Sequence, residues 1–150
     1  MINISEFRKL SGTEIGISEW IFLTQEKVNQ FADVTGDHQF IHVDPVAAKA
    51  AGFDSTIVHG YYLLSLVSKF LFDLLPEVEG TSAVLNYGLN KVRFIASVPV
   101  GSRVRGQVSM TEITERGAGQ FLATFKIILE IEGQDKPAFI AEQLTLFLTS

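Results

Sequence analysis

Residues 61–75 read Tyr61-Tyr-Leu-Leu-Ser-Leu-Val-Ser-Lys-Phe-Leu-Phe-Asp-Leu-Leu75, and Pro76 follows directly. This length makes about four helical turns, and proline ends the segment because it cannot continue a helix. Apolar residues occupy nearly every side of this helix, namely Leu63, Leu64, Leu66, Val67, Phe70, Leu71 and Leu74. A helix that is apolar all round belongs in the interior of a domain. The sequence therefore predicts a buried helix over residues 61–75.

The pattern changes after Pro76, where four segments predict strands: 82–94, 103–114, 120–131 and 139–148. Turn signals separate them at Val98-Pro-Val-Gly101, Gly117-Ala-Gly119 and Gly133-Gln-Asp135. The run from Arg103 to Ile113 alternates polar and apolar residues, as expected for a sheet with one solvated face. These segments predict a long antiparallel meander.

The residues before the apolar helix predict one more strand and two short helices. Residues 14–23, EIGISEWIFL, favour a strand. Thr24 and Gly36 are typical of the start and end of a helix, and Asp44-Pro45 and Gly52 repeat those signals. The order of strand, helices and meander predicts an α+β domain. An apolar helix must then be wrapped by the sheet, so we expect a hot-dog fold, with the antiparallel sheet around a long central helix.

Composition narrows the classes of protein. The 150 residues contain no linker or repeat, so we expect residues 1–150 to form a single domain. A mean hydropathy of +0.25 indicates a face buried against another subunit. The net charge of −5 argues against general nucleic-acid binding. The absence of cysteine excludes a disulfide framework, a thiolate metal site and a cysteine nucleophile.

Two segments bear on location. The first ten residues, MINISEFRKL, lack the apolar core of a signal peptide. The longest apolar segment, residues 61–75, is shorter than the ~20 residues needed to span a bilayer. We therefore expect a soluble cytoplasmic protein that does not enter a membrane.

Two polar residues and one glycine predict the chemistry. Asp37 and His42 lie five residues apart after Gly36, and Gly60 opens the apolar helix. A carboxylate and an imidazole can jointly hold and deprotonate a water. Backbone N–H groups at a helix start can stabilise a developing oxyanion. The sequence therefore predicts addition of water to an activated acyl group, or its removal.

These residues also form a recognisable pattern. Asp37-x4-His42-x5-Ala48 is followed by Val58-His-Gly60, by Asn86-Tyr-Gly-Leu-Asn-Lys-Val-Arg-Phe94 and by Val98-Pro-Val-Gly-Ser-Arg-Val-Arg105. The chain resembles the MaoC-like (R)-specific enoyl-CoA hydratases, in particular their nodulation-protein-N-like branch. It departs from many members at Gln39-Phe40, where they have Asn-Pro.

The resemblance implies a homodimer that hydrates trans-2-enoyl thioesters of coenzyme A or acyl-carrier protein with R stereochemistry, or catalyses the reverse dehydration. It assigns the binding and activation of water to Asp37 and His42, and the binding of the thioester carbonyl to the Gly60 N–H. Ser68 falls where relatives place a serine near the site. No cofactor is implied, since coenzyme A is part of the substrate.

Other residues have both a functional and a structural interpretation. His59, Tyr62 and Ser68 are candidates for substrate binding, although packing or a hydrogen bond to a helix carbonyl would also explain them. His38 could also be a polar site residue, although a role in the turn would explain it as well. The three histidines lack a recognised ligand spacing, so no metal site is predicted. Four basic residues could meet coenzyme A phosphates, although solvated strand faces explain them as well: Lys91, Arg93, Arg103 and Arg105.

Two alternative functions remain at this stage. The first is a hot-dog thioesterase, in which a carboxylate on the central helix often activates the water. The predicted helix has no Glu, and its only acid, Asp73, lies near the far end. The second is a non-catalytic acyl-binding protein, which the intact Asp37 and His42 pair disfavours.

Overall fold

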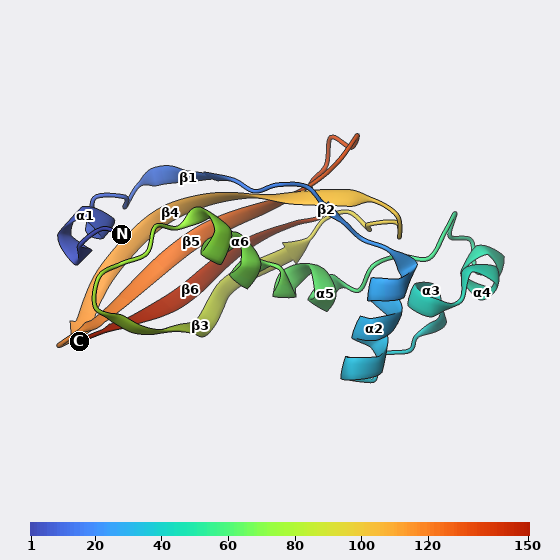
Figure 1. Cartoon of the computed structure of the whole chain (residues 1–150). Helices are drawn as coiled ribbons and strands as arrows, with labels where there is room; N and C mark the ends of the chain where they lie inside the picture. Colours follow the sequence, from blue (N-terminus) through green and yellow to red (C-terminus); the bar gives the residue numbers. More distant parts are fainter.

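The computed structural model describes residues 1–150 and contains one six-stranded antiparallel sheet. Its path is β1–β4–β5–β6–β3, and β2 pairs with β4 beside β1. The sheet curves along α5 and α6 (Figure 1), so the predicted α+β hot-dog fold is confirmed. The strands are β1 (Thr13–Ile17), β2 (Ile21–Phe22), β3 (Thr81–Phe94), β4 (Arg103–Gly117), β5 (Gln120–Ile131) and β6 (Phe139–Thr149).

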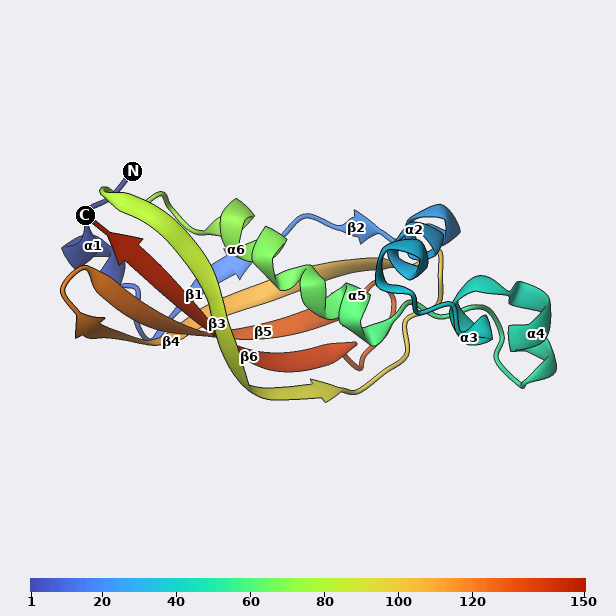
Figure 2. The same cartoon turned by 90° about the horizontal axis from the view of Figure 1, so that it is seen from below.

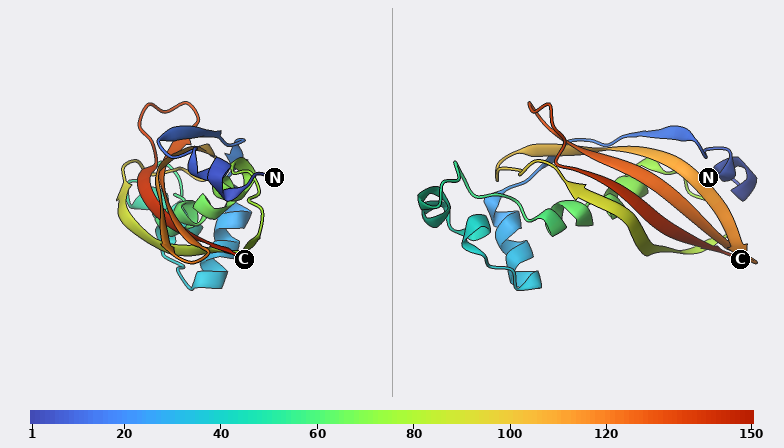
Figure 3. Two further views of the ribbon diagram at one scale, coloured as in Figure 1. Left: turned by 90° about the vertical axis from the view of Figure 1, so that its left-hand side faces the viewer. Right: turned by 180° about the vertical axis from the view of Figure 1, so that it is seen from behind.

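The helices divide into three groups. In Figure 2, α5 and α6 cross the concave face of the sheet, whereas α2, α3 and α4 lie beyond one end of it. We call residues 24–60 the cap. Figure 3 shows α1 and both chain termini at the opposite end. None of the helices has the length and apolar content that crossing a bilayer requires. The helices are α1 (Ile4–Arg8), α2 (Gln25–Thr35), α3 (Phe40–Val43), α4 (Pro45–Ala50), α5 (Gly60–Ser65) and α6 (Val67–Leu74).

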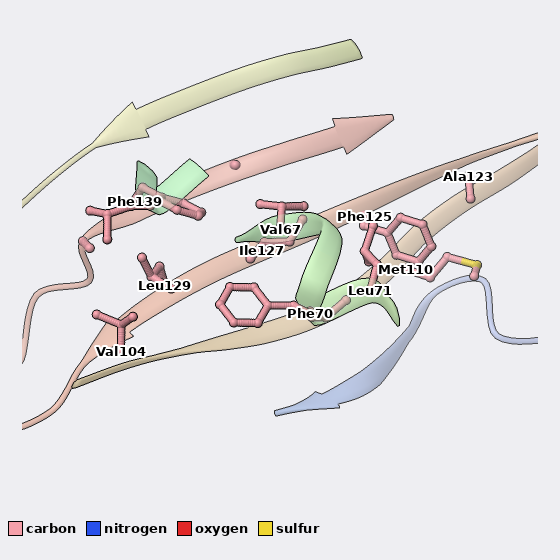
Figure 4. Close-up of a cluster of buried hydrophobic side chains, with 14 of the residues drawn as sticks. Val67, Phe70, Leu71, Val104, Met110, Ala123, Phe125, Ile127, Leu129 and Phe139 are labelled. Carbon is pink, nitrogen blue, oxygen red and sulfur yellow. The ribbon is translucent and has the colours of Figure 1, made fainter. Parts of the chain in front are cut away.

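The core lies between α6 and the sheet. Val67, Phe70 and Leu71 point from α6 toward buried side chains of β4, β5 and β6, as Figure 4 shows. Phe70 approaches β4 so closely that a Cβ at Gly106 would lie 2.6 Å from its ring. Position 106 therefore has to be glycine for the helix to seat on the sheet.

The central helix differs from the prediction in two ways. It is interrupted at Leu66, because the Ser65 hydroxyl donates to the Tyr62 carbonyl (2.6 Å) and the Leu66 N–H turns to Leu63 instead (3.2 Å). It is also not buried all round, since Tyr61 is 75% exposed and Phe72 is 72% exposed. The sheet covers only one side of this helix, which leaves an apolar side uncovered in the single chain.

The predicted strand over residues 14–23 is also wrong as one element. It divides into β1 and β2 because Ser18 interrupts the ladder: its N–H donates to the Gly106 carbonyl and its hydroxyl accepts from the Gly106 N–H, both at 2.9 Å. The short helices α1 and α3 were not predicted. A capping box between Asn3 and Glu6 starts α1, and this signal was present in the sequence.

The helix boundaries in the cap are confirmed. The Thr24 hydroxyl accepts from the Lys27 N–H, and Gly36 ends α2 with a φ of 81°. The Asp44 carboxylate accepts from the N–H groups of Val46 and Ala47, with Pro45 at the first position of α4. These caps fix where the connecting segments lie; Asp37 and His42 are in the segment between α2 and α4, with His42 on α3.

Candidate active site

His42 is held by the single turn of α3 and by one strong hydrogen bond. Its Nδ1 lies 2.7 Å from the Ile57 carbonyl oxygen. A carbonyl only accepts, so Nδ1 carries the proton, and in the neutral ring Nε2 has a free lone pair. Nε2 faces Asp37 Oδ2 at 4.0 Å. The buried imidazole is thereby oriented with its basic nitrogen toward the carboxylate.

Asp37 follows Gly36 directly and has a side chain that is 50% exposed. Its Oδ1 accepts from the Gln39 N–H at 3.3 Å, and Oδ2 faces His42. The 4.0 Å between Oδ2 and Nε2 is too long for a direct hydrogen bond. One water oxygen at about 2.8 Å from each atom fits this spacing. The two residues that the sequence pattern singled out therefore lie together.

His59 forms the third wall of the site. Its ring stacks on His42 with centroids 3.9 Å apart and an interplanar angle of 24°. Nε2 lies 3.0 Å from the Asp37 carbonyl oxygen, to which it donates, while the buried Nδ1 has no partner. Burial lowers the pKa of His59, because protonation would place a charged N–H where no acceptor exists. The side chain therefore connects the segments that carry Asp37 and His42.

Gly60 is the first residue of α5, and its N–H has no acceptor in the chain. This is expected at a helix start, where the first N–H groups lack intrahelical partners. A Cβ at this position would lie 3.1 Å from the Phe94 ring. The glycine thus leaves room for the Phe94 ring, and its free N–H can receive a developing negative charge.

The other predicted residues lie outside this group. Tyr62 contacts Phe31 (ring centroids 5.1 Å apart), and Phe31 in turn contacts His59 (4.9 Å), so Tyr62 supports the site from behind. Burial raises the pKa of Tyr62. Ser68 lies farther along, on α6, and donates to Asn86 Oδ1 at 3.4 Å rather than to Asp37 or His42.

The weaker candidates have structural partners. His38 is exposed and lies 2.9 Å from Asp33, whose carboxylate raises the pKa of the imidazole. Arg105 donates to both oxygens of Glu130 and stacks on Trp20 at 4.3 Å. These contacts account for His38 and Arg105 without a ligand.

Two further residues support His42. Gln25 Nε2 donates to the His42 carbonyl at 2.8 Å, and the Thr56 hydroxyl donates to Gln25 Oε1 at 2.6 Å. In the sequence, Gln25 indicated only the first turn of a helix. These two contacts join residues that are 17 and 31 positions apart in the chain, and such contacts leave no local signal in the sequence. Sequence reasoning therefore missed both Gln25 and Thr56.

The arrangement is poorly suited to a metal ion. Ligand atoms of Asp37, His42 and His59 lie within 4.8 Å of one another. However, the two rings are stacked, so their in-plane lone pairs run side by side instead of converging on one point. Nδ1 of His42 and Nε2 of His59 are already bonded to carbonyl oxygens. The geometry favours a bound water over a metal.

Comparison with known proteins gives several close matches. Over 146 residues the chain is 44% identical to 3-hydroxyacyl-thioester dehydratase Z of Mycobacterium tuberculosis H37Rv, covering 97% of this chain and 96% of that protein. Nodulation protein N of Rhizobium leguminosarum bv. viciae is 41% identical, with coverage of 97% and 91%.

Solved structures agree with these relatives. The (R)-hydratase from A. caviae involved in PHA biosynthesis superposes with a TM-score of 0.73 at 26% identity, covering 89% of this chain and 96% of that one. The M. tuberculosis HadBC complex has a TM-score of 0.77 at 13% identity, with coverage of 91% and 96%, and supports the fold alone. The family model described as MaoC like domain matches residues 6–129. The chain belongs to the MaoC-like domain family.

Proposed function

We propose that the protein catalyses the (R)-specific hydration of trans-2-enoyl thioesters, or the reverse dehydration of 3-hydroxyacyl thioesters. One observation carries the proposal: Asp37 Oδ2 and His42 Nε2 face each other at 4.0 Å, a spacing that one water can bridge. The names of the dehydratase from M. tuberculosis and the hydratase from A. caviae support the same chemistry.

The mechanism follows from the positions of three groups. Asp37 and His42 hold a water against Cβ of the substrate, which is electrophilic because the thioester carbonyl withdraws electrons. As the water oxygen bonds to Cβ, a proton passes to the Asp37–His42 pair. The carbonyl oxygen becomes an enolate that the Gly60 N–H stabilises. Proton delivery to Cα completes the 3-hydroxyacyl thioester. No electrons are transferred overall, so the reaction needs no redox cofactor.

Incubation with crotonyl-CoA tests the reaction class. Loss of the enoyl absorbance without release of free thiol is the expected result. Thiol release would instead mean hydrolysis, which the structure disfavours because the only acid on α5 and α6, Asp73, is paired with Lys69 at 2.6 Å. No change in either signal would leave a non-catalytic acyl-binding protein.

The R configuration at C3 is a separate part of the proposal. It rests on the similarity to (R)-hydratases, and the handedness follows from which face of the double bond the bound water meets. Chiral chromatography of the hydrated product should show the R isomer, whereas a dominant S product would contradict this assignment.

A homodimer would cover the exposed apolar surface. β3 pairs only with β6, so its other edge is free, and a long apolar edge strand is a template for pairing with another chain. Sedimentation equilibrium at micromolar concentration should give twice the chain mass of 16.6 kDa, and a folded monomer would contradict the dimer. The exposed apolar side chains on α5, α6 and β3 are Tyr61, Phe72, Val84, Leu85, Tyr87, Leu89 and Phe94.

The remaining parts of the proposal concern the setting of the reaction. The substrate is a thioester of coenzyme A or of acyl-carrier protein, and residues 1–150 act as one domain in the cytoplasm. A comparison of kcat/KM for one enoyl chain on the two carriers would identify which of them the protein uses.

A further inference from the structure

Three buried side-chain atoms in the chain have no hydrogen-bond partner: His59 Nδ1, Thr81 Oγ1 and Thr145 Oγ1. Such atoms are uncommon because an unpaired buried donor or acceptor is costly. His59 lies in the active site. The two threonines lie elsewhere, but both line one groove beside α6. This coincidence points to a ligand in the groove, and Thr145, at 1% exposure, is the more deeply buried of the two.

The groove with the two threonines, which we call the distal groove, has a volume of about 470 Å³ and lies between α6 and the first half of β3. The proximal groove, of about 390 Å³, begins at Tyr61 next to Gly60. Both volumes are typical of small-molecule sites. The grooves share Ser68 and Asn86, so together they form one path along α5 and α6 that begins at Tyr61.

The distal groove has largely apolar walls, formed by side chains such as Leu71, Leu75, Val84 and Phe147. Four polar side chains interrupt the apolar lining where the two grooves meet. We call them the polar cluster: Ser68, Asn86, Gln143 and Thr145.

The polar cluster has unused hydrogen-bonding capacity. Asn86 Oδ1 accepts from the Ser68 hydroxyl (3.4 Å) and from Gln143 Nε2 (3.2 Å), which leaves the Asn86 amide N–H groups free. Thr145 is the cross-strand partner of Asn86 and is 1% exposed. It lies on the inward side of β6, where its neighbours are Gln143, a member of the cluster, and the apolar Phe147. An alkyl chain beside this cluster would leave the buried Thr145 hydroxyl unpaired.

We infer that the acyl chain of the substrate carries a hydroxyl group that binds at the polar cluster. This inference rests on the proposed function and names its substrate class. A hydroxyl both donates and accepts, so it can pair with the Asn86 amide and with the Thr145 hydroxyl. Gly60 and Ser68 are eight helical residues apart, so the hydroxyl lies about 12 Å from the thioester carbonyl, on a chain of medium length.

A matched substrate pair tests the inference. The kcat/KM for ω-hydroxy-trans-2-decenoyl-CoA should exceed that for trans-2-decenoyl-CoA by about tenfold, since a single unpaired buried polar group has that effect. Thr145→Val keeps the side-chain shape and removes only the hydroxyl. This variant should lower the preference toward unity.

Thr124→Val is the matched control, because Thr124 is also buried on the sheet but lines neither groove. It should leave the preference unchanged. Equal kcat/KM for the two substrates, with no effect of Thr145→Val, would overturn the inference, while hydration of crotonyl-CoA would still support the proposed function.

Calorimetry provides a readout that does not depend on turnover. The wild type should bind ω-hydroxydecanoyl-CoA about tenfold more tightly than decanoyl-CoA. Thr145→Val should bind the two ligands with equal affinity. This experiment tests the cluster even if crotonyl-CoA is not hydrated. Equal binding of the two ligands to the wild type would overturn the inference. Equal binding is also the result expected if side chains of a second copy of the chain fill the distal groove.

Discussion

The cap and the body of the molecule are held together by different forces. The body, formed by the sheet and α6, buries large apolar side chains such as Phe70, Phe125 and Phe139 completely. The cap places His42, His59 and Gln25 by bonds from side chains to backbone carbonyls and to one another. Apolar burial is non-directional, whereas each hydrogen bond fixes one atom in one direction.

This difference assigns separate roles to the two regions. The body provides the stability and a rigid surface from which α5 starts. The cap provides direction, since each of its two site imidazoles is fixed by a carbonyl oxygen at 2.7 or 3.0 Å. Substitutions in the body should therefore change the free energy of unfolding, and substitutions in the cap should change kcat.

The largest expected effect on stability is in the body. Phe70→Ala should lower the free energy of unfolding by about 3–5 kcal/mol, since it leaves a cavity against β4. Phe22→Ala on β2, where the ring is half-exposed, should cost about 1 kcal/mol or less. Urea titrations of both variants test this, and equal losses would show that the packing of α6 is not the main source of stability.

Gly60→Ala tests the junction of the two regions. The added methyl group should lower kcat/KM by about tenfold or more, because it holds the substrate carbonyl away from the backbone N–H. Its contact with the Phe94 ring would also lower activity by crowding. The double variant Gly60→Ala/Phe94→Ala makes room for the methyl and should stay slow. Recovery of activity in the double variant would mean that the loss came only from crowding.

The smallest expected effect is a pH dependence within the cap. Burial lowers the pKa of His59 below 6.5, so the unfolded chain binds more protons and stability falls as the pH drops through that range. His38 has the opposite sign, because Asp33 raises its pKa and the stabilisation is present at low pH and lost as the pH rises. The advantage of wild type over His59→Phe should shrink between pH 7.5 and 5.5, whereas its advantage over His38→Gln should grow.

Thermal melts across this pH range measure both differences. Parallel curves for wild type and His59→Phe would contradict the account of a buried neutral imidazole. Parallel curves of melting temperature against pH for wild type and His38→Gln would show that the exposed pair with Asp33 contributes nothing to stability. Many surface ion pairs make no measurable contribution.

Local signals were sufficient for most of the fold. The caps at Thr24, Gly36 and Asp44 and the alternation in β4 predicted their elements because these features depend on neighbours in the sequence. The breaks at Ser18 and Leu66 were missed. The break at Ser18 is caused by hydrogen bonds to Gly106, 88 residues away. The break at Leu66 arises because the Ser65 hydroxyl donates to the Tyr62 carbonyl instead of to solvent.

The site was predictable in its members but not in its geometry. The spacing of Asp37 and His42 predicted a pair that the structure brings to 4.0 Å, and Gly60 follows His59, whose ring stacks on His42. The stacking of His59 on His42 depends on how the cap folds back onto α5, and no periodicity indicates it. The bond from the Ser68 hydroxyl to Asn86 on β3 joins residues 18 positions apart, so no local pattern indicates it either.

The central claim is that Asp37 and His42 act as one unit on a single water. A double-mutant cycle in kcat tests it with wild type, Asp37→Asn, His42→Ala and the double variant, and thermal melts confirm that each is folded. Each single change should lower kcat by about 10²-fold or more, the scale of general acid–base catalysis. The double variant should be scarcely slower than the slower single variant, because either residue alone cannot orient the water. Losses that multiply, or near-normal turnover in folded Asp37→Asn, would contradict the claim.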